Sequence, residues 1–297
     1  MSEHPTIHTK IWTALELLKW GTGYFSEKNI DSPRLTMEII LCEVLECSRV
    51  QLYLNYEKPL TGGELAKLRI MTNKRANREP LQYILGKTEF YGLPFFVDSS
   101  VLIPRPETEI LVELAINNIK KITQESISVL DIGTGSGCIA VTLAKKLPKC
   151  RIVAIDVSAG ALDIARRNAE ANDVDVEFIR RDVLKEMKVK QPFDVIVSNP
   201  PYISSDEMTE IEPELALYEP QIALTDGGDG LEFYRRFSTL FNDILSQKGV
   251  FFVEIGYNQA EKVEALFSQN FECRIHNDLA NIPRVLQGKR KCNVIEM

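Results

Sequence analysis

The fold is decided by the stretch SVLDIGTGSG, residues 128–137, in which an apolar run leads directly into three glycines. The apolar run predicts a strand over residues 128–132, and the pattern that follows at 138–144 predicts a helix. Glycines at such a strand-to-helix turn adopt positive φ and let the backbone approach a ligand closely. We therefore predict a ligand-binding loop at Gly133–Gly137.

The spacing of these glycines argues against a dinucleotide. The nicotinamide and flavin fingerprint is G-x-G-x-x-G, and its third glycine would fall where this chain has Cys138. A second apolar strand ends at Asp156, 21 residues beyond Gly135, where an acid can accept both hydroxyls of a ribose. A third strand ends near Asp182, where an acid could meet an adenine amino group. The pattern predicts a nucleoside site without a pyrophosphate and disfavours a dinucleotide oxidoreductase.

The run Asn199-Pro200-Pro201-Tyr202 follows another apolar strand, residues 193–198. Two prolines remove backbone N–H donors, keep their carbonyls and stiffen the loop. The remaining acceptors, the Asn199 side-chain oxygen and the Pro200 carbonyl, stand beside the aromatic face of Tyr202. They suit a planar NH2 group, which donates two hydrogen bonds and stacks on the ring. The run predicts a site for an amide or a base amino group; a rigid loop without function is the alternative.

Strands and helices alternate from residue 128 onward, which predicts an α/β fold with a doubly wound, mostly parallel sheet. Ligands bind beyond the carboxyl ends of the strands of such sheets, so the glycine loop, Asp156, Asp182 and Asn199 are expected in one site. One helix is expected to be capped by Asp229. The expected strands lie at 128–132, 151–156, 175–179, 193–198, 250–255, 271–276 and 291–296.

The amino-terminal part predicts short helices. Ser32 followed by Pro33 is typical of a helix start, and Thr61 with Glu64 fits a capping box. On the helix after Ser32 we expect a buried face made by Leu35, Ile39, Cys42 and Leu45. Two apolar runs around residues 92–94 predict a β-hairpin. We expect a helical domain at 1–78, a linker with the hairpin at 79–103 and an α/β domain at 104–297.

Composition narrows the class of protein. A length of 297 residues favours two domains, and 44% hydrophobic with 26% charged residues is ordinary for a globular protein. No apolar run reaches the roughly 18 residues of a membrane span, and the amino terminus has no signal-peptide pattern. The six cysteines show no metal-ligand spacing, which predicts reduced thiols. We expect a cytoplasmic protein that contacts no membrane and holds no metal.

The charge of the chain argues against a nucleic-acid partner. Residues 91–297 carry 23 Lys and Arg against 31 Asp and Glu, an excess that suits phosphate neutralisation poorly. A local basic face remains an alternative at Lys67, Arg69, Lys74, Arg75 and Arg78, which are otherwise read as a solvated helix face.

Together, DIGTGSG at 131–137 and NPPY at 199–202 resemble the class I S-adenosylmethionine-dependent methyltransferases that act on a planar nitrogen. Further segments narrow this resemblance to the peptide-chain release factor glutamine methyltransferases, the PrmC/HemK family. These segments are residues 78–86, 90–95, 101–109, 219–220, 227–235 and 254–256. One departure is Asn281, where the family often has glycine.

The resemblance implies a Rossmann-like fold, a helical substrate-recognition domain and S-adenosyl-L-methionine as cofactor, with S-adenosyl-L-homocysteine as product. It implies methyl transfer to the side-chain nitrogen (N5) of the glutamine in the Gly-Gly-Gln motif of class I release factors, modulating translation termination. We expect a monomer that does not bind nucleic acid directly. Asn199, Pro200 and Tyr202 are the candidate catalytic residues, and with Pro201 they are expected to bind the substrate. The candidate cofactor-binding residues are Gly133, Thr134, Gly135, Ser136, Gly137, Asp156, Asp182, Val183 and Asn199.

Two other functions stay open from the residues alone. The acceptor loop does not distinguish a glutamine amide from adenine N6, cytosine N4 or guanine N2, so a nucleic-acid methyltransferase is an alternative. A non-catalytic module that binds a nucleoside is another. The intact glycines, Asp156 and the complete NPPY run argue against the second.

Overall fold

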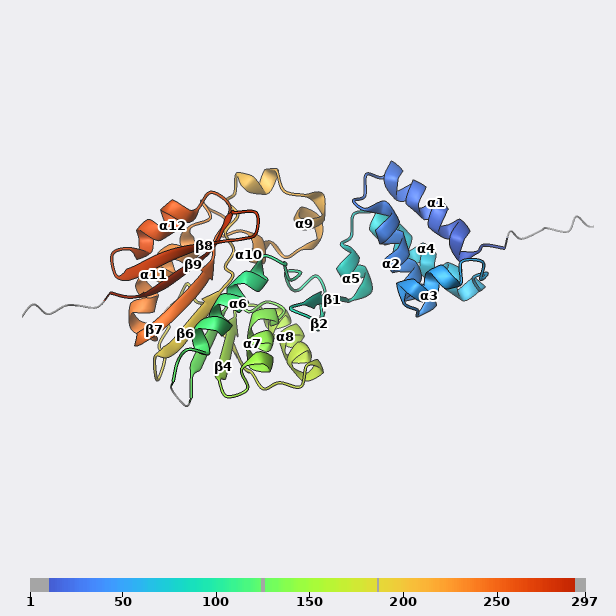
Figure 1. Ribbon diagram of the computed structural model, residues 1–297. Helices are drawn as coiled ribbons and strands as arrows, with labels where there is room; N and C mark the ends of the chain where they lie inside the picture. Colours follow the sequence, from blue (N-terminus) through green and yellow to red (C-terminus); the bar gives the residue numbers. More distant parts are fainter. Residues whose placement is uncertain (1–10, 124–125, 186, 292–297) are drawn as a thin grey trace, which may run out of the picture. The chain divides into compact units, whose positions relative to one another are not determined.

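The computed structural model describes residues 11–123, 126–185 and 187–291 (Figure 1). The chain divides into two compact units, residues 1–85 (unit 1) and 86–297 (unit 2). The hairpin of β1 (Lys87–Phe90) and β2 (Leu93–Phe96) belongs to unit 2, whereas we expected it in a separate linker. Phe90 and Phe95 explain this placement because both are buried in the core of that unit.

Unit 1 is helical, as predicted. Capping boxes at Thr13, Ser48 and Thr61 start three of its helices, and Pro33 is the first residue of a fourth. Each box satisfies backbone N–H groups that a helix start leaves without a partner. The helices are α1 (Ala14–Glu27), α2 (Pro33–Leu45), α3 (Arg49–Leu54), α4 (Gly62–Ala76) and α5 (Leu81–Leu85).

The buried face of α2 differs from the expected one. Leu35 is 41% exposed, whereas Cys42 and Leu45 are half-buried against the core as expected. The fully buried hydrophobic residues of the helix are Met37, Ile40, Leu41 and Val44. Apolar residues occupy most positions of α2, so its sequence contains more than one apolar stripe. Because α2 contacts both α1 and α4, packing selects the stripe that the sequence pattern left undetermined.

Two groups of side chains characterise the surface of unit 1. An aromatic cluster joins Trp12, Trp20 and Tyr24, with the Trp20 and Tyr24 rings stacked at a centroid distance of 5.3 Å. The basic residues of α4 make contacts inside the unit: Lys74 pairs with Glu79 at 3.1 Å, and buried Arg75 donates to the Glu79 carbonyl. Two members of the basic cluster are therefore engaged within unit 1, and Arg75 is not part of a solvated helix face.

Unit 2 is built on a sheet that, in the described part of the chain, has seven strands in the order β5-β4-β3-β6-β7-β9-β8. Strand β9 pairs antiparallel with β7 and with β8, and the other neighbouring pairs of the sheet are parallel, so the predicted mostly parallel α/β architecture is confirmed. The strands are β3 (Ser128–Ile132), β4 (Arg151–Asp156), β5 (Glu177–Arg180), β6 (Phe193–Ser198), β7 (Leu245–Glu254), β8 (Phe271–Asn277) and β9 (Pro283–Arg290).

Strand β9 was not predicted from the sequence, and it ends at Arg290. The strand expected at 291–296 falls almost entirely on residues 292–297, which lie outside the described residues. Strand β9 pairs with both β7 and β8, which satisfies its backbone groups on two sides. The loop before it contains Asn281 with φ +61°, so this Asn adopts the left-handed conformation that a glycine would adopt.

Helices cover both faces of the sheet (Figure 1). Helices α6 and α7 pack on Val129 and Val197, and α11 and α12 pack on Leu130 and Ile196. Neighbouring residues of one strand thus enter opposite cores, as the period of two in a strand requires. The helices of unit 2 are α6 (Thr108–Ile119), α7 (Cys138–Lys146), α8 (Ala159–Ala171), α9 (Pro213–Tyr218), α10 (Gln221–Leu224), α11 (Glu232–Ile244) and α12 (Ala260–Phe267).

The start of α11 corrects one prediction. Asp229 is not its cap; the Asp226 carboxylate accepts from the Glu232 N–H at 2.9 Å, at the first residue of the helix. Asp229 instead forms an ion pair with Arg235.

The strand order reverses beside β3, since the chain leaves β3 toward β4 and β5 and later returns to β6 on the other side. Ligands of such sheets bind at this switch point, beyond the carboxyl ends of the strands. Among the helices that the structure describes, none combines the length and the apolar character needed to cross a bilayer.

Candidate functional site

A cavity of about 240 Å³ lies at the carboxyl ends of the central strands of unit 2. The glycine loop, the end of β4, the segment after β5 and the NPPY loop all contribute to its wall. The structure thus brings together most of the predicted site residues. Those lining this cavity are Gly133, Thr134, Gly135, Ser136, Asp156, Asp182, Val183, Asn199, Pro200 and Pro201.

The glycine loop is fixed by short-range contacts. The N–H groups of Gly133 and Thr134 donate to the Ile155 carbonyl at 2.9 and 3.0 Å, which ties the loop to β4. The Thr134 hydroxyl donates to Asp131 Oδ2 at 2.6 Å. Burial raises the pKa of this Asp131 carboxyl to about 7.

The loop fits a ligand whose atoms come close to the backbone. Gly133 and Gly135 have φ of +72° and +53°, and a Cβ added at either would meet no protein atom within 4 Å. Both positions also line the cavity. A nucleoside-containing cofactor can therefore lie directly against these glycines.

Gly137 has a different place from the other two glycines. It is the N-cap residue of α7, and an added Cβ would lie 3.0 Å from the Ala165 Cβ of α8. It is not among the described residues that line the cavity. Gly137 serves close helix packing, although we expected it against the cofactor.

Asp156 stands at the end of β4 and faces the cavity. Its Oδ2 accepts from the Gly135 N–H at 2.9 Å and its Oδ1 from the Ser158 N–H at 2.9 Å. Burial raises its pKa, and these backbone donors partly offset the shift. Because each carboxylate oxygen has a second lone pair, both remain able to accept a ribose hydroxyl.

Asp182 and Val183 form the wall after β5. Asp182 accepts from the Leu184 N–H at 3.0 Å and pairs with Lys185 at 3.2 Å, so it also stabilises a turn. Val183 is 7% exposed and supplies an apolar surface suited to a flat base. Cys138, at the position that argued against a dinucleotide, is buried, and burial raises the pKa of its thiol to about 12.

Asn199 is held by two residues that are distant in sequence. Its Nδ2 donates to Thr108 Oγ1 at 3.1 Å, and the Thr108 hydroxyl donates to Glu254 Oε2 at 2.7 Å. Thr108 and Glu254 are each 2% exposed. In the described part of the chain no group donates to Asn199 Oδ1, so this oxygen is available as an acceptor.

Tyr202 lines a second, smaller cavity of about 60 Å³ rather than the larger one. Arg105, Asn199 and Pro200 line both cavities, so these two spaces share a wall. The Arg105 guanidinium pairs with Glu219 at 2.6 Å. The two acceptors predicted from the sequence therefore stand between a large and a small pocket.

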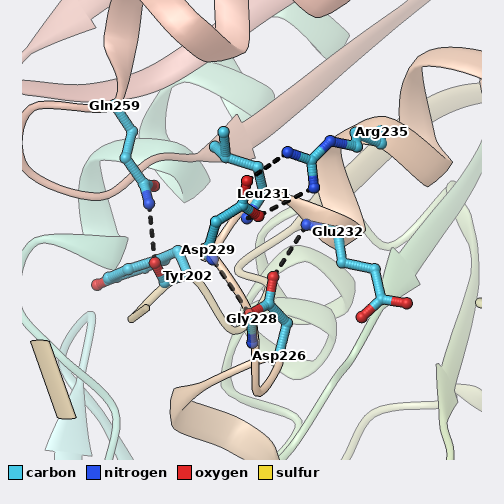
Figure 2. A network of polar contacts seen from close by, with 9 residues as sticks. Tyr202, Asp226, Gly228, Asp229, Leu231, Glu232, Arg235 and Gln259 are labelled. Carbon is cyan, nitrogen blue, oxygen red and sulfur yellow. Dashed lines mark hydrogen bonds and ion pairs between the residues drawn. The ribbon is translucent and has the colours of Figure 1, made fainter. Parts of the chain in front are cut away.

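The backbone of Tyr202 is held by a hydrogen bond from Gln259. Gln259 Oε1 accepts from the Gly256 N–H at 3.1 Å. Gln259 Nε2 donates to the Tyr202 carbonyl at 2.8 Å (Figure 2). The turn that carries Asp226 and Asp229 lies beside this contact (Figure 2). A Cβ added at Gly230 of that turn would lie 2.3 Å from the Tyr202 carbonyl oxygen, so only glycine fits there.

Glu254 is linked by hydrogen bonds to the first and the last residue of the NPPY loop. Its Oε2 accepts from Thr108, which holds Asn199, and its Oε1 accepts from the Tyr202 hydroxyl at 3.4 Å. Burial raises the pKa of the Glu254 carboxyl to about 7 and also raises that of Tyr202. A buried acid is costly unless its oxygens find donors, and both oxygens do here.

Sequence reasoning did not assign a role to Thr108, Glu254 or Gln259. Their segments were noted only as part of the family resemblance. The available signal was Glu254 itself, a single acid at the end of the apolar run of residues 250–255. His276 is not part of this site. It contacts Gln287 at 2.7 Å on the β8–β9 pair and lines neither cavity.

Comparisons with known proteins agree with this geometry. A family model described as PrmC N-terminal domain matches residues 16–86, and one described as Methyltransferase small domain matches residues 108–231. A release factor glutamine methyltransferase from Geobacter sulfurreducens is 43% identical over 97% of this chain and 99% of its own length. The chain belongs to the release factor glutamine methyltransferase family. It is an S-adenosylmethionine-dependent enzyme.

Another member of the release factor glutamine methyltransferase family, from Chlorobaculum tepidum, is 43% identical over 93% of this chain and 97% of its own length. Solved structures confirm the fold at lower identity. A methyltransferase from Pyrococcus furiosus has a TM-score of 0.50 and 19% identity, covering 75% of this chain and 97% of that one. The hMettl16 catalytic domain has a TM-score of 0.53 and 17% identity, covering 77% and 81%.

Proposed function

We propose that this protein transfers the methyl group of S-adenosyl-L-methionine to the side-chain amide nitrogen (N5) of the glutamine in the Gly-Gly-Gln motif of class I peptide-chain release factors. Such a modification modulates translation termination. The family supports the substrate. The observation that carries the chemistry is the position of Asn199 and Pro200 on the wall shared by the two cavities.

The larger cavity is the proposed cofactor site. Gly133 and Gly135 allow close approach, Asp156 would hold the ribose hydroxyls, and Asp182 with Val183 would flank the adenine. When bound, the cofactor supplies a methyl group on a positively charged sulfonium. Apolar residues such as Phe237 also line this cavity.

The shared wall is the proposed acceptor site. An amide nitrogen is a weak nucleophile because its lone pair is delocalised into the carbonyl. Asn199 Oδ1 and the Pro200 carbonyl would accept its two N–H bonds, which raises the electron density on nitrogen and fixes its direction. Tyr202, in the smaller cavity, would line the amide plane. Orientation of this kind can contribute on the order of 7–11 kcal/mol at its upper limit.

The helical domain at 1–78 would then recognise the release factor, since none of its described residues lines either cavity. A cytoplasmic location and a monomeric state stay predictions from the sequence. The hMettl16 catalytic domain was solved in complex with MAT2A 3'UTR hairpin 1, but its likeness to this chain concerns the fold alone. The nucleic-acid alternative is therefore tested by the experiment below.

The test uses the full chain with methyl-labelled cofactor and three acceptors: a class I release factor, the same factor with its Gly-Gly-Gln glutamine replaced by alanine, and DNA or RNA. We expect label on the first alone, mapped to that glutamine by mass spectrometry. Label on the nucleic acid, or on the alanine variant at an equal rate, would contradict the proposed substrate.

A further inference from the structure

We propose that Thr108 and Glu254 are positioning residues that determine which end of the Asn199 carboxamide faces the acceptor. The inference rests on the proposed function, because it concerns the same acceptor site. Asn199 donates a hydrogen bond to Thr108, and Thr108 donates one to Glu254.

The need for such a device follows from the shape of the side chain. The oxygen and nitrogen ends of a carboxamide have nearly the same size, so packing alone does not distinguish them. Only the oxygen end can accept an N–H from an acceptor amide or amino group. An Asn199 turned the other way would present its own NH2 to the substrate NH2, donor against donor.

The order of donors follows from Glu254. Above its pKa of about 7, Glu254 is a carboxylate that has acceptors only, so the single hydroxyl proton of Thr108 is drawn to Glu254 Oε2, at 2.7 Å. The Thr108 oxygen then has only lone pairs for its other partner, and the group 3.1 Å away must be the donating end of Asn199, Nδ2. The oxygen Oδ1 is thereby left for the cavity.

The path is protected from competition. Glu254 is 2% exposed and lines neither cavity, so water does not replace its hydrogen bond to Thr108. Thr108 is also 2% exposed and lines the larger cavity beside Asn199. Thr108 is the first residue of α6 and Glu254 the last residue of β7, so both ends of the path stand on regular elements. The second carboxylate oxygen accepts from the Tyr202 hydroxyl, so both polar groups of the acceptor loop depend on one acid.

The decisive variants are Thr108→Val, which has nearly the same shape but no hydroxyl, and Thr108→Ser, which keeps it. A surface substitution of the same type, Thr239→Val on α11, is the matched control. Methyl transfer is measured at about pH 8.5, where Glu254 is ionised. Misplacement of a reacting group by about 1 Å can cost on the order of 100-fold in rate. We therefore expect Thr108→Val to lower kcat by about 10- to 100-fold, with the release-factor KM and cofactor Kd within about threefold.

Thr108→Ser should restore most of the rate, and Glu254→Gln should give an intermediate kcat because an amide can either donate to or accept from Thr108. Thr108→Val with wild-type kcat would overturn the inference. So would Thr108→Ser as slow as Thr108→Val, since the loss would then come from packing and not from the hydroxyl.

A second readout does not require an acceptor. The side-chain amide signals of Asn199 in an ¹⁵N-resolved NMR spectrum, assigned by their loss in Asn199→Ala, should shift in Thr108→Val and return toward wild type in Thr108→Ser. Unchanged signals in Thr108→Val would contradict the inference. If the wild type labels nucleic acid and not release factor, the proposed substrate fails, and the same variants assayed on that acceptor still test the positioning roles.

Discussion

The glycine loop and the NPPY loop follow neighbouring strands of one sheet, yet they are held in different ways. Residues 133–137 are fixed by their own positive φ angles and by contacts to the next strand, at Ile155 and Asp156. Residues 199–202 are fixed from a distance, by Thr108, Glu254 and Gln259. A loop that binds a constant cofactor can be set locally, whereas a loop that must direct a weak nucleophile depends on several distant elements.

Asn199→Ala should have the largest effect and should separate the roles of the two loops. We expect kcat to fall by about 10²- to 10³-fold, the order seen when a hydrogen-bonding group aimed at the reacting atoms of an active site is removed. The glycine loop is intact in this variant, so the cofactor Kd from titration calorimetry should stay within a few-fold of wild type. Loss of cofactor binding with turnover retained would reverse the two assigned roles.

Gly230→Ala tests whether the NPPY loop is supported from behind. Its Cβ would lie 2.3 Å from the Tyr202 carbonyl oxygen, so the loop must move, and we expect kcat to fall by about 100-fold. Gly227→Ala is the matched control, because Gly227 has a similar φ of +77° and no atom within 4 Å of an added Cβ. It should show backbone strain of about 1–2 kcal/mol and little change in rate. Equal rates in the two variants would show that the clash with Tyr202 is unimportant.

Stability should fall as pH rises, because the NPPY loop is supported by a buried acid. Burial raises the pKa of Glu254 from 4.5 to about 7, so the folded protein keeps a proton that the unfolded chain has already lost. The stabilisation is complete below pH 4.5 and is lost as pH rises through about 7. A shift of this size corresponds to about 3 kcal/mol.

Urea denaturation followed by circular dichroism at a series of pH values measures this dependence. Glu254→Gln should flatten the decline, whereas Glu272→Gln, at a half-exposed carboxyl on β8, should not. Asp131 and Asp156, whose pKa values are also raised by burial, contribute to the slope that remains. An unchanged slope in Glu254→Gln would mean that this acid is ionised throughout.

Gly135→Ala should give the smallest effect and one confined to the cofactor. The added methyl enters the cavity and not the protein, and alanine is disfavoured at φ +53°. We expect the cofactor Kd to rise by about tenfold, with kcat at saturating cofactor within about threefold. A large fall in kcat at saturation would mean that the two loops are not as independent as the structure indicates.

Sequence alone located most of this site because its signals are local. Three glycines after a strand, an acid at the end of the next strand and two prolines beside Asn199 each restrict the backbone within a few residues. Parallel strands then bring their ends to one edge, which is why Gly135, Asp156 and Asn199 line one cavity.

Features that depend on packing were harder to predict. Gly137 is spaced like its neighbours, but only the position of Ala165 shows that it serves helix contact. Nothing near Asn199 in sequence indicates Thr108, 91 residues away. On α2 the excess of apolar residues left the buried stripe open, and Asp226 rather than Asp229 starts α11 because the turn between them places its carboxylate at the helix end.

The aromatic cluster of α1 has a practical consequence. Both tryptophans of the chain, Trp12 and Trp20, lie in unit 1, and unit 2 has none. Intrinsic fluorescence excited at about 295 nm therefore reports the surroundings of tryptophans in the helical unit alone. An engineered tryptophan in unit 2 would give each unit its own optical label.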